Sequence, residues 1–184
     1  MKATDILTEE HGVILRVLDS LETSTTRLSA GEEVSMDFFL KAADFIKGFA
    51  DGCHHKKEEG VLFEAMVANG MSREMGPVAV MLAEHEQGRQ LTRGMRESAE
   101  RVQAGDPKAL PQVLQSAQGY VALLRQHIMK EDNVLFPMAN QTIPEGQHQK
   151  IEVAFDHIEH EETGEGIHEK YLGIAEELEK MMAA

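Results

Sequence analysis

One ten-residue pattern occurs twice in this chain and constrains its fold more than any other feature. The pattern H-x-x-K-E-[DE]-x-V-L-F begins at His54 and again at His127, 73 residues later. A second pair, Glu10-His11 and Glu84-His85, repeats at a distance of 74 residues. The two nearly equal offsets indicate a duplicated unit that contains one lone His and one His-x3-Glu. We therefore expect two similar helical hairpins that fold together.

Long segments rich in Ala, Leu, Met, Glu, Gln and Lys lie between a few helix-breaking sites. These residues are good helix formers, while Gly and Pro gather at the breaks. Ser35 and Asp106 are suitable N-caps, and Pro77 suits a first helical turn. We expect an all-α protein with helices at about 5–29, 35–68, 77–104, 108–141 and 147–182.

The short connections between these helices determine the expected architecture. Short loops favour antiparallel neighbours, so the first four helices predict an up-down antiparallel four-helix bundle over residues 1–142. Residues 143–184 would add a C-terminal helix packed on the bundle. This additional helix could also form the contact of a homodimer.

Several histidines and glutamates fall on the apolar stripes of the predicted helices. At about 100° per residue, each stripe defines the face that points into the bundle. An unpaired carboxylate at such a position would be costly. Lys47, Arg89 and Arg96 also fall on or near these stripes and interrupt the pattern. The polar residues on the stripes are His11, His54, Glu58, His85, His127 and Glu131.

The types and spacing of these residues point to metal binding. Residues i and i+4 of a helix share a face, so each His-x3-Glu can converge on one ion. Four imidazoles and two carboxylates are too many ligands for one tetrahedral zinc ion. They suit two metals, each with two nitrogens and shared carboxylates. Mixed imidazole and carboxylate ligation favours iron, with zinc or manganese as possible substitutes. The alternative is a buried polar network without metal.

This arrangement resembles the hemerythrin-like (HHE cation-binding) proteins, whose signature is H…HxxxE…H…HxxxE on a four-helix bundle. The match covers roughly residues 5–140. The resemblance implies an oxo- or hydroxo-bridged non-haem di-iron centre with Glu58 and Glu131 as bridges. It also implies that His11 and His54 ligate one iron, while His85 and His127 ligate the other.

One ligand of the oxygen-carrying hemerythrins has no match in this chain. Those proteins have two histidines one turn apart on the third helix, whereas Arg89 follows His85 by a turn and Met81 precedes it. His55 is either a replacement for this ligand or a solvated helix residue. Asp132 matches the carriers' spacing, but it projects about 100° away from Glu131, which we therefore prefer as the ligand.

The expected function is a reaction with, or binding of, O2, NO or peroxide at an open coordination site. One version is enzymatic turnover. The other is a binding module that senses oxygen or iron, stores iron or delivers it. The residues do not decide between these two versions.

The overall charge and composition exclude other classes of partner. The formal net charge is −14, which argues against binding nucleic acid or an anionic membrane through a basic surface. The longest apolar run, Val78 to Ala83, is far shorter than the ~20 residues of a membrane-spanning helix. Residues 1–12 contain no apolar segment of a secretory signal, and a lone cysteine, Cys53, suits a reducing compartment. We expect a cytoplasmic protein in which Cys53 serves packing.

Some further residues have two interpretations each. His157, His160 and Glu161 could form a second metal site, although a solvated acidic face is the preferred interpretation. Tyr120 is either a core residue or a group near the metal with a redox role. Gly88 either permits close helix contact or opens space for a small ligand.

Overall fold

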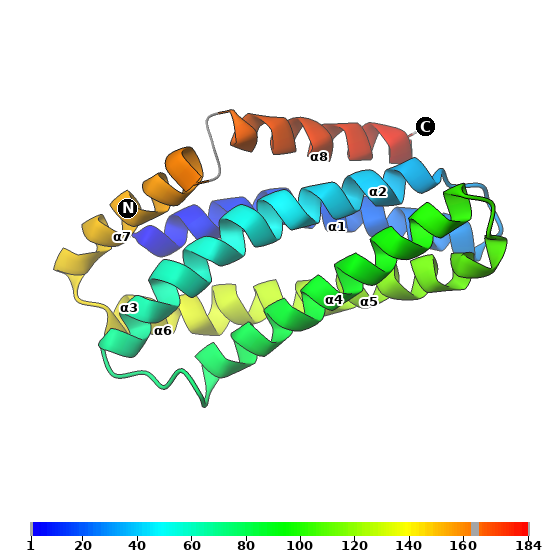
Figure 1. Ribbon diagram of the computed structural model, residues 1–184. Coiled ribbons are helices and arrows are strands. Elements are labelled where there is room, and N and C mark those ends of the chain that lie inside the picture. The colour runs from blue at the N-terminus through cyan, green and yellow to red at the C-terminus, as the bar shows by residue number, and fades with distance from the viewer. Residues whose placement is uncertain (1, 163–165, 184) are drawn as a thin grey trace.

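The computed structural model describes residues 2–162 and 166–183, and every regular element in them is helical. Four antiparallel helical stretches form an up-down bundle, and a C-terminal helix lies along its outside (Figure 1). This confirms the predicted all-α class and bundle. The first and third stretches are α1 (Ala3–Ser29) and α4 (Pro77–Gln103). The second joins α2 (Met36–Phe45) to α3 (Phe63–Ala68), and the fourth joins α5 (Leu110–Lys130) to α6 (Phe136–Thr142).

The helix starts follow the local chemistry of the sequence. The Ser35 hydroxyl accepts a hydrogen bond from the Asp37 backbone N–H, and the Asp106 carboxylate accepts one from Lys108 N–H. Such bonds satisfy donors that the first turn of a helix leaves free. Both predicted N-caps are therefore confirmed. Asp106 caps a short 3₁₀ turn, η3 (Pro107–Ala109), which leads into α5.

The second and fourth stretches contain π-helical turns at the duplicated pattern. Between α2 and α3 lie η1 (Ile46–His55) and η2 (Glu58–Leu62), and between α5 and α6 lies η4 (Glu131–Leu135). One π segment thus begins at Glu58 and another at Glu131. The wider π turn is rare and often marks functional sites. The sequence pattern alone did not predict these turns.

The single helix expected over 147–182 is wrong, because this region forms two helices. The first is α7 (Glu145–His157), which continues into the π turn η5 (Ile158–Glu162), and the second is α8 (Ile167–Ala183). Gly166, just before α8, has a φ of 75°, which is outside the helical region. α8 packs along α1 and α2 (Figure 1), with Ala175 and Leu178 fully buried.

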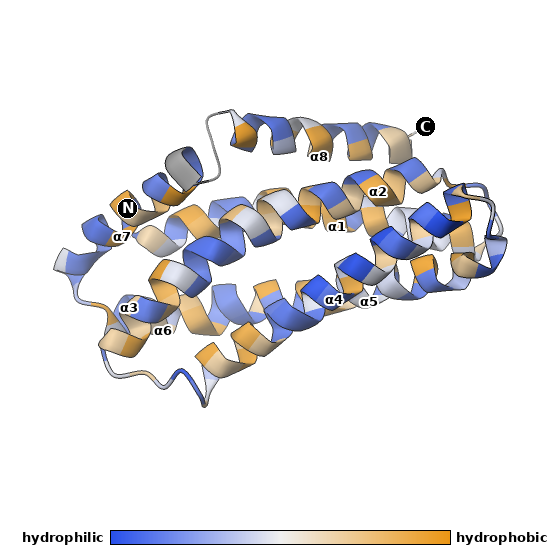
Figure 2. Ribbon diagram, in the orientation of Figure 1, coloured by the Kyte–Doolittle hydropathy of each residue, from blue (hydrophilic) through white to orange (hydrophobic). Residues whose placement is uncertain are grey.

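The apolar core consists of two clusters, with polar side chains between them. One cluster includes Ile14, Phe45 and Leu178, and the other includes Leu7, Phe63 and Phe155. His11 lies on α1 between Leu7 and Ile14, so the polar layer separates the clusters. Figure 2 shows apolar residues on the inward faces of the helices. Two water-excluding clusters thus enclose the predicted metal ligands.

A close contact between Gly48 and Tyr171 tests how α8 is held. A Cβ atom at Gly48 would lie 1.7 Å from the Tyr171 hydroxyl oxygen. We expect Gly48→Ala to displace this ring and lower the free energy of unfolding by roughly 1–3 kcal/mol, as overpacking does. Urea denaturation measures the change. Gly173→Ala in α8 is the control: a Cβ there meets no atom within 4 Å, so stability should rise by roughly 0.5–1 kcal/mol. A wild-type stability for Gly48→Ala would contradict the described packing.

Candidate metal centre

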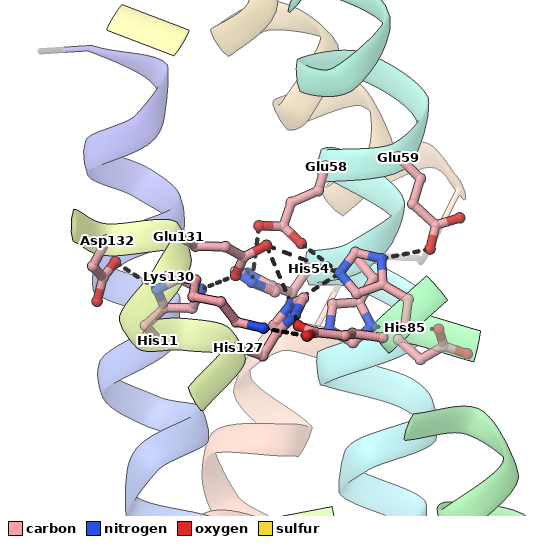
Figure 3. A network of polar contacts seen from close by, with 12 residues as sticks. His11, His54, Glu58, Glu59, His85, His127, Lys130, Glu131 and Asp132 are labelled. Atoms are coloured by element: carbon pink, nitrogen blue, oxygen red, sulfur yellow. Dashed lines mark hydrogen bonds and ion pairs between the residues drawn. The ribbon is translucent and has the colours of Figure 1, made fainter. Parts of the chain in front are cut away.

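All of the predicted ligands lie together in the polar layer of the bundle, and Figure 3 labels those other than His55. They come from all four helical stretches, and none is more than 4% exposed. The duplicated pattern contributes donors from the second and fourth stretches, and the lone histidines contribute one donor from α1 and one from α4. The residues are His11, His54, His55, Glu58, His85, His127 and Glu131.

The donor atoms form two sets that share a carboxylate. One set consists of His11, His54, Glu58 and Glu131, and its ligating atoms all lie within 4.8 Å of one another. The other consists of Glu58 with three histidines, within the same limit: His55, His85 and His127. His11 and His54 therefore lie in one set, and His85 and His127 lie in the other. His55 joins the second pair.

Each glutamate presents one oxygen to each set. Glu58 Oε1 is 3.5 Å from His54 Nε2, while its Oε2 is 3.4 Å from His85 Nε2. Glu131 Oε2 is 3.2 Å from His11 Nε2, while its Oε1 is 3.1 Å from His127 Nε2. Both carboxylates therefore span the two sets, as a bridge between two cations requires.

These buried oxygens have no hydrogen-bond partner. None of the four carboxylate oxygens of Glu58 and Glu131 accepts a hydrogen bond, despite the short distances to imidazole nitrogens. Burying a polar atom without a partner is costly, and a buried carboxylate is worse. His11 Nε2 and both nitrogens of His55 are also unpartnered. The donor set thus fits a pair of cations, which would satisfy these atoms.

The other nitrogen of four imidazole rings is bound by a carboxylate. His11 Nδ1 donates to Asp132 at 2.8 Å, and His85 Nδ1 donates to Glu59 at 2.7 Å. In the same way His54 donates to Glu10 at 2.8 Å, and His127 to Glu84 at 2.9 Å. Such bonds orient metal-binding histidines, set their tautomer and raise their basicity. The Nε2 atoms are left to face the centre.

This outer layer accounts for the rest of the duplicated pattern. The Glu before each lone His binds the His of the ten-residue pattern that follows it in the chain. It also binds the Lys of that pattern: Lys57 contacts Glu10 at 2.5 Å, and Lys130 contacts Glu84. The acid that follows Glu58 or Glu131 binds a lone His, as Asp132 does with His11. Sequence reasoning missed these roles, although every such residue recurs in the repeat. Asp132 therefore contacts His11 rather than joining the donor sets.

The fifth-ligand position also has a structural use. Arg89 donates to Asp51 at 2.7 Å and to Glu59 at 2.5 Å. Glu59 in turn accepts the hydrogen bond from His85. Arg89 therefore holds the carboxylate that orients His85, a predicted ligand, and does not itself take the place of the missing histidine. His55 stacks on His85, with ring centroids 3.9 Å apart. Burial and the neighbouring His85 lower the pKa of His55 well below its usual value, so its ring is neutral, as a metal ligand must be.

The C-terminal extension contacts the His54 half of the centre. Glu159, on η5, contacts the Lys57 ammonium at 2.6 Å, and Lys57 is fully buried between Glu159 and Glu10. Burial disfavours this cation, but the carboxylate of Glu10 outweighs it and raises the pKa of Lys57. Glu10, Cys53 and Glu159 also lie close enough together to hold a cation, but the Lys57 ammonium already forms ion pairs with both carboxylates. Burial raises the pKa of the Cys53 thiol to about 11, so Cys53 stays protonated.

The second metal site considered for the C-terminal region is not formed by the residues that the structure describes. His160 is exposed and lies 3.3 Å from Asp156, and no donor set within 2–162 and 166–183 includes it or His157. The side chain of Glu161 lies outside the described residues.

Comparison with known proteins assigns the chain to a family. The hemerythrin HHE cation binding domain matches residues 2–139, and the chain belongs to this family. Uncharacterized proteins of Mycobacterium bovis and Mycobacterium tuberculosis are 24% identical over 180 residues, covering 98% of this chain and 70% of theirs. No solved structure matched. Within the described residues, no helix is both long enough and apolar enough to cross a membrane.

The two lysines of the duplicated pattern provide a matched test of burial. Lys57→Met leaves two carboxylates without their cation in a buried setting, so we expect a loss of roughly 3–5 kcal/mol in the free energy of unfolding. The side chain of Lys130 is 33% exposed. We therefore expect Lys130→Met to lower the free energy of unfolding by about 1 kcal/mol or less. Equal losses of unfolding free energy for the two variants in urea denaturation would show that the C-terminal extension does not bury Lys57 as described.

Removing metal should make stability depend on pH. Burial opposes protonation of both His11 and His85, but nearby carboxylates outweigh it. Asp132 contributes most to raising the pKa of His11 from the usual 6.5 to about 10. Glu58 contributes most to raising the pKa of His85 from 6.5 to about 9. Protonated histidines then stabilise the fold fully below pH 6.5, and this stabilisation is lost as pH rises through 9 and 10.

We therefore expect chelator-treated protein to lose thermal stability between about pH 7 and 10. Metal-loaded protein should lose less, because its cations do not titrate away. Circular dichroism melting curves of both samples across this range provide the measurement. Parallel pH profiles would contradict the expectation.

Proposed function

We propose that this protein is a non-haem di-iron protein that binds or reacts with O2, NO or peroxide. The observation that carries the proposal is the placement of Glu58 and Glu131, each with one unpartnered oxygen toward each histidine set. A single tetrahedral zinc ion would leave part of this donor set unused. Imidazole and carboxylate together suit iron.

The two sets would leave their ions with unequal coordination. The His11 and His54 set offers two imidazoles and two bridging oxygens, while His55 adds a third imidazole to the other set. Iron commonly takes more ligands than four, so the first position retains room for a small exogenous ligand. The iron supplies the redox chemistry when bound.

The protein's own residues prepare the site for that chemistry. His11 and His127 outweigh the effect of burial and hold the pKa of Glu131 well below its usual range, so this bridge is ionised. The outer carboxylates fix the rings, as Glu10 does for His54. The two apolar clusters exclude bulk water from the layer between them. These features support a small, uncharged or weakly polar ligand at the centre.

The neighbouring residues Glu131 and Asp132 allow a matched test of which acid binds the metal. After aerobic loading with ferrous iron, we expect about two iron ions per chain, near-ultraviolet absorption, and a spectral change on adding azide. Glu131→Gln removes a bridge and should reduce the iron content below one ion per chain. Asp132→Asn, the matched control, should retain two ions and weaken binding by roughly 10–100-fold. Elemental analysis showing less than one iron per wild-type chain would refute the proposal.

The same loaded protein separates the two versions of the function. Catalytic consumption of O2 or peroxide, measured over many turnovers, would establish an enzyme. Reversible spectral changes with a fixed stoichiometry would establish a binding module for sensing, storage or delivery.

A further inference from the structure

A cavity of about 270 Å³ lies directly beside the second histidine set. His55 and His85 line its inner part, and buried residues from the second stretch, α4 and α5 form its walls: Ile46, Gly88, Thr92 and Tyr120. The volume is slightly below the usual range for ligand sites, roughly 300–1,000 Å³. The cavity is therefore suited to a molecule about the size of a substituted benzene ring.

The mouth of this cavity is cationic, although the chain is strongly acidic. Lys47, Arg89, Arg93 and Arg96 line it together with a single carboxylate, Asp51. A cluster of four cations is not expected from the composition, because the chain has 18 basic and 32 acidic residues. Positive charge at the entrance of a largely apolar cleft attracts anions. Three of these cations are the residues that interrupt the apolar stripes in the sequence.

Two of the four cations are available to a ligand. Arg89 is engaged by Asp51 and Glu59, and Arg96 contacts Asp44. By contrast, Lys47 is exposed and has no carboxylate within ion-pair distance among the described residues. Arg93 makes one long contact, 3.5 Å from Glu86, with both side chains mostly exposed. Lys47 and Arg93 can therefore turn to an incoming anion at little cost.

The cavity also contains a buried hydroxyl without a partner. Tyr120 is 1% exposed, and its hydroxyl makes no hydrogen bond within the described structure. Leaving such a group unpaired is unfavourable, so a ligand atom that bonds to it would gain affinity. Gly88 lies close to α5 beside this hydroxyl: an added Cβ would make ordinary van der Waals contact with Tyr120 and Leu124, each at 3.6 Å.

We propose that this cavity binds a small amphipathic organic acid, specifically an aromatic carboxylate with a polar group at its far end. Its carboxylate binds Lys47 and Arg93, its ring lies against Ile46 and Thr92, and its far end reaches the Tyr120 hydroxyl. The inference deepens the proposed function and rests on it, because the acid would lie next to His55 and His85 as an organic substrate, while the small ligand takes the open position near His11 and His54.

The test uses 4-hydroxybenzoate as the probe on full-length, iron-loaded protein. Isothermal titration calorimetry should detect binding of the acid, and at least about tenfold weaker binding of 4-hydroxybenzyl alcohol, since a charge-assisted hydrogen bond contributes roughly 1.5–3 kcal/mol. The double variant Lys47→Gln/Arg93→Gln should reduce affinity for the acid by about tenfold or more. Tyr120→Phe should reduce it several-fold for 4-hydroxybenzoate but not for benzoate.

Control variants and iron analysis separate the possible failures. Lys180→Gln/Arg101→Gln removes the same charge from exposed positions outside the cavity and should leave affinity unchanged. Equal binding of acid and alcohol, or no loss in the Lys47/Arg93 variant, would overturn the inference. If iron-loaded protein shows no binding of 4-hydroxybenzoate, this inference is overturned and the di-iron proposal is not affected. Acid binding by protein that never takes up iron would overturn the di-iron proposal instead and leave the anion site standing.

Discussion

The negative charge of two fully buried carboxylates is the constraint on which the structure depends. Glu58 and Glu131 bring this charge into the middle of an apolar bundle, where it is stable only if positive charge accompanies it. Four imidazoles surround the pair, and each ring is held in place by an outer carboxylate, as Asp132 holds His11. The two apolar clusters on either side make the charge costly and keep the donors in fixed positions.

The inner donor set was predictable from the sequence, whereas the outer layer was not. The repeat pairs His54 with Glu58 and His127 with Glu131, and the 3.6-residue period places them on inward faces. The contact between Glu10 and His54 depends instead on how two helices meet in space, which periodicity does not encode. The π turns at Glu58 and Glu131 and the break near Gly166 were missed for a similar reason: both arise from local backbone geometry within segments of good helix formers.

Residues that weakened the sequence pattern have specific places in the structure. Arg89 occupies the position of a missing ligand, yet it binds Glu59 and so supports His85. Lys47 and Arg96 interrupt apolar stripes because that side of the bundle opens into a cavity rather than a packed core. In this chain, polar residues on the predicted inward faces therefore mark a cavity as well as the candidate metal centre.

The C-terminal extension makes a duplicated centre unequal. Glu159 adds a carboxylate on the His54 side, and within the described residues Lys130 has no equivalent partner beyond Glu84 on the His127 side. A cation near His11 and His54 would thus experience a more negative electrostatic potential than its neighbour. The two positions would differ in affinity, so that ions enter and leave them in a preferred order. The symmetry inherited from duplication persists in the paired histidines and glutamates, whereas His55 and the electrostatic field around the two positions break it.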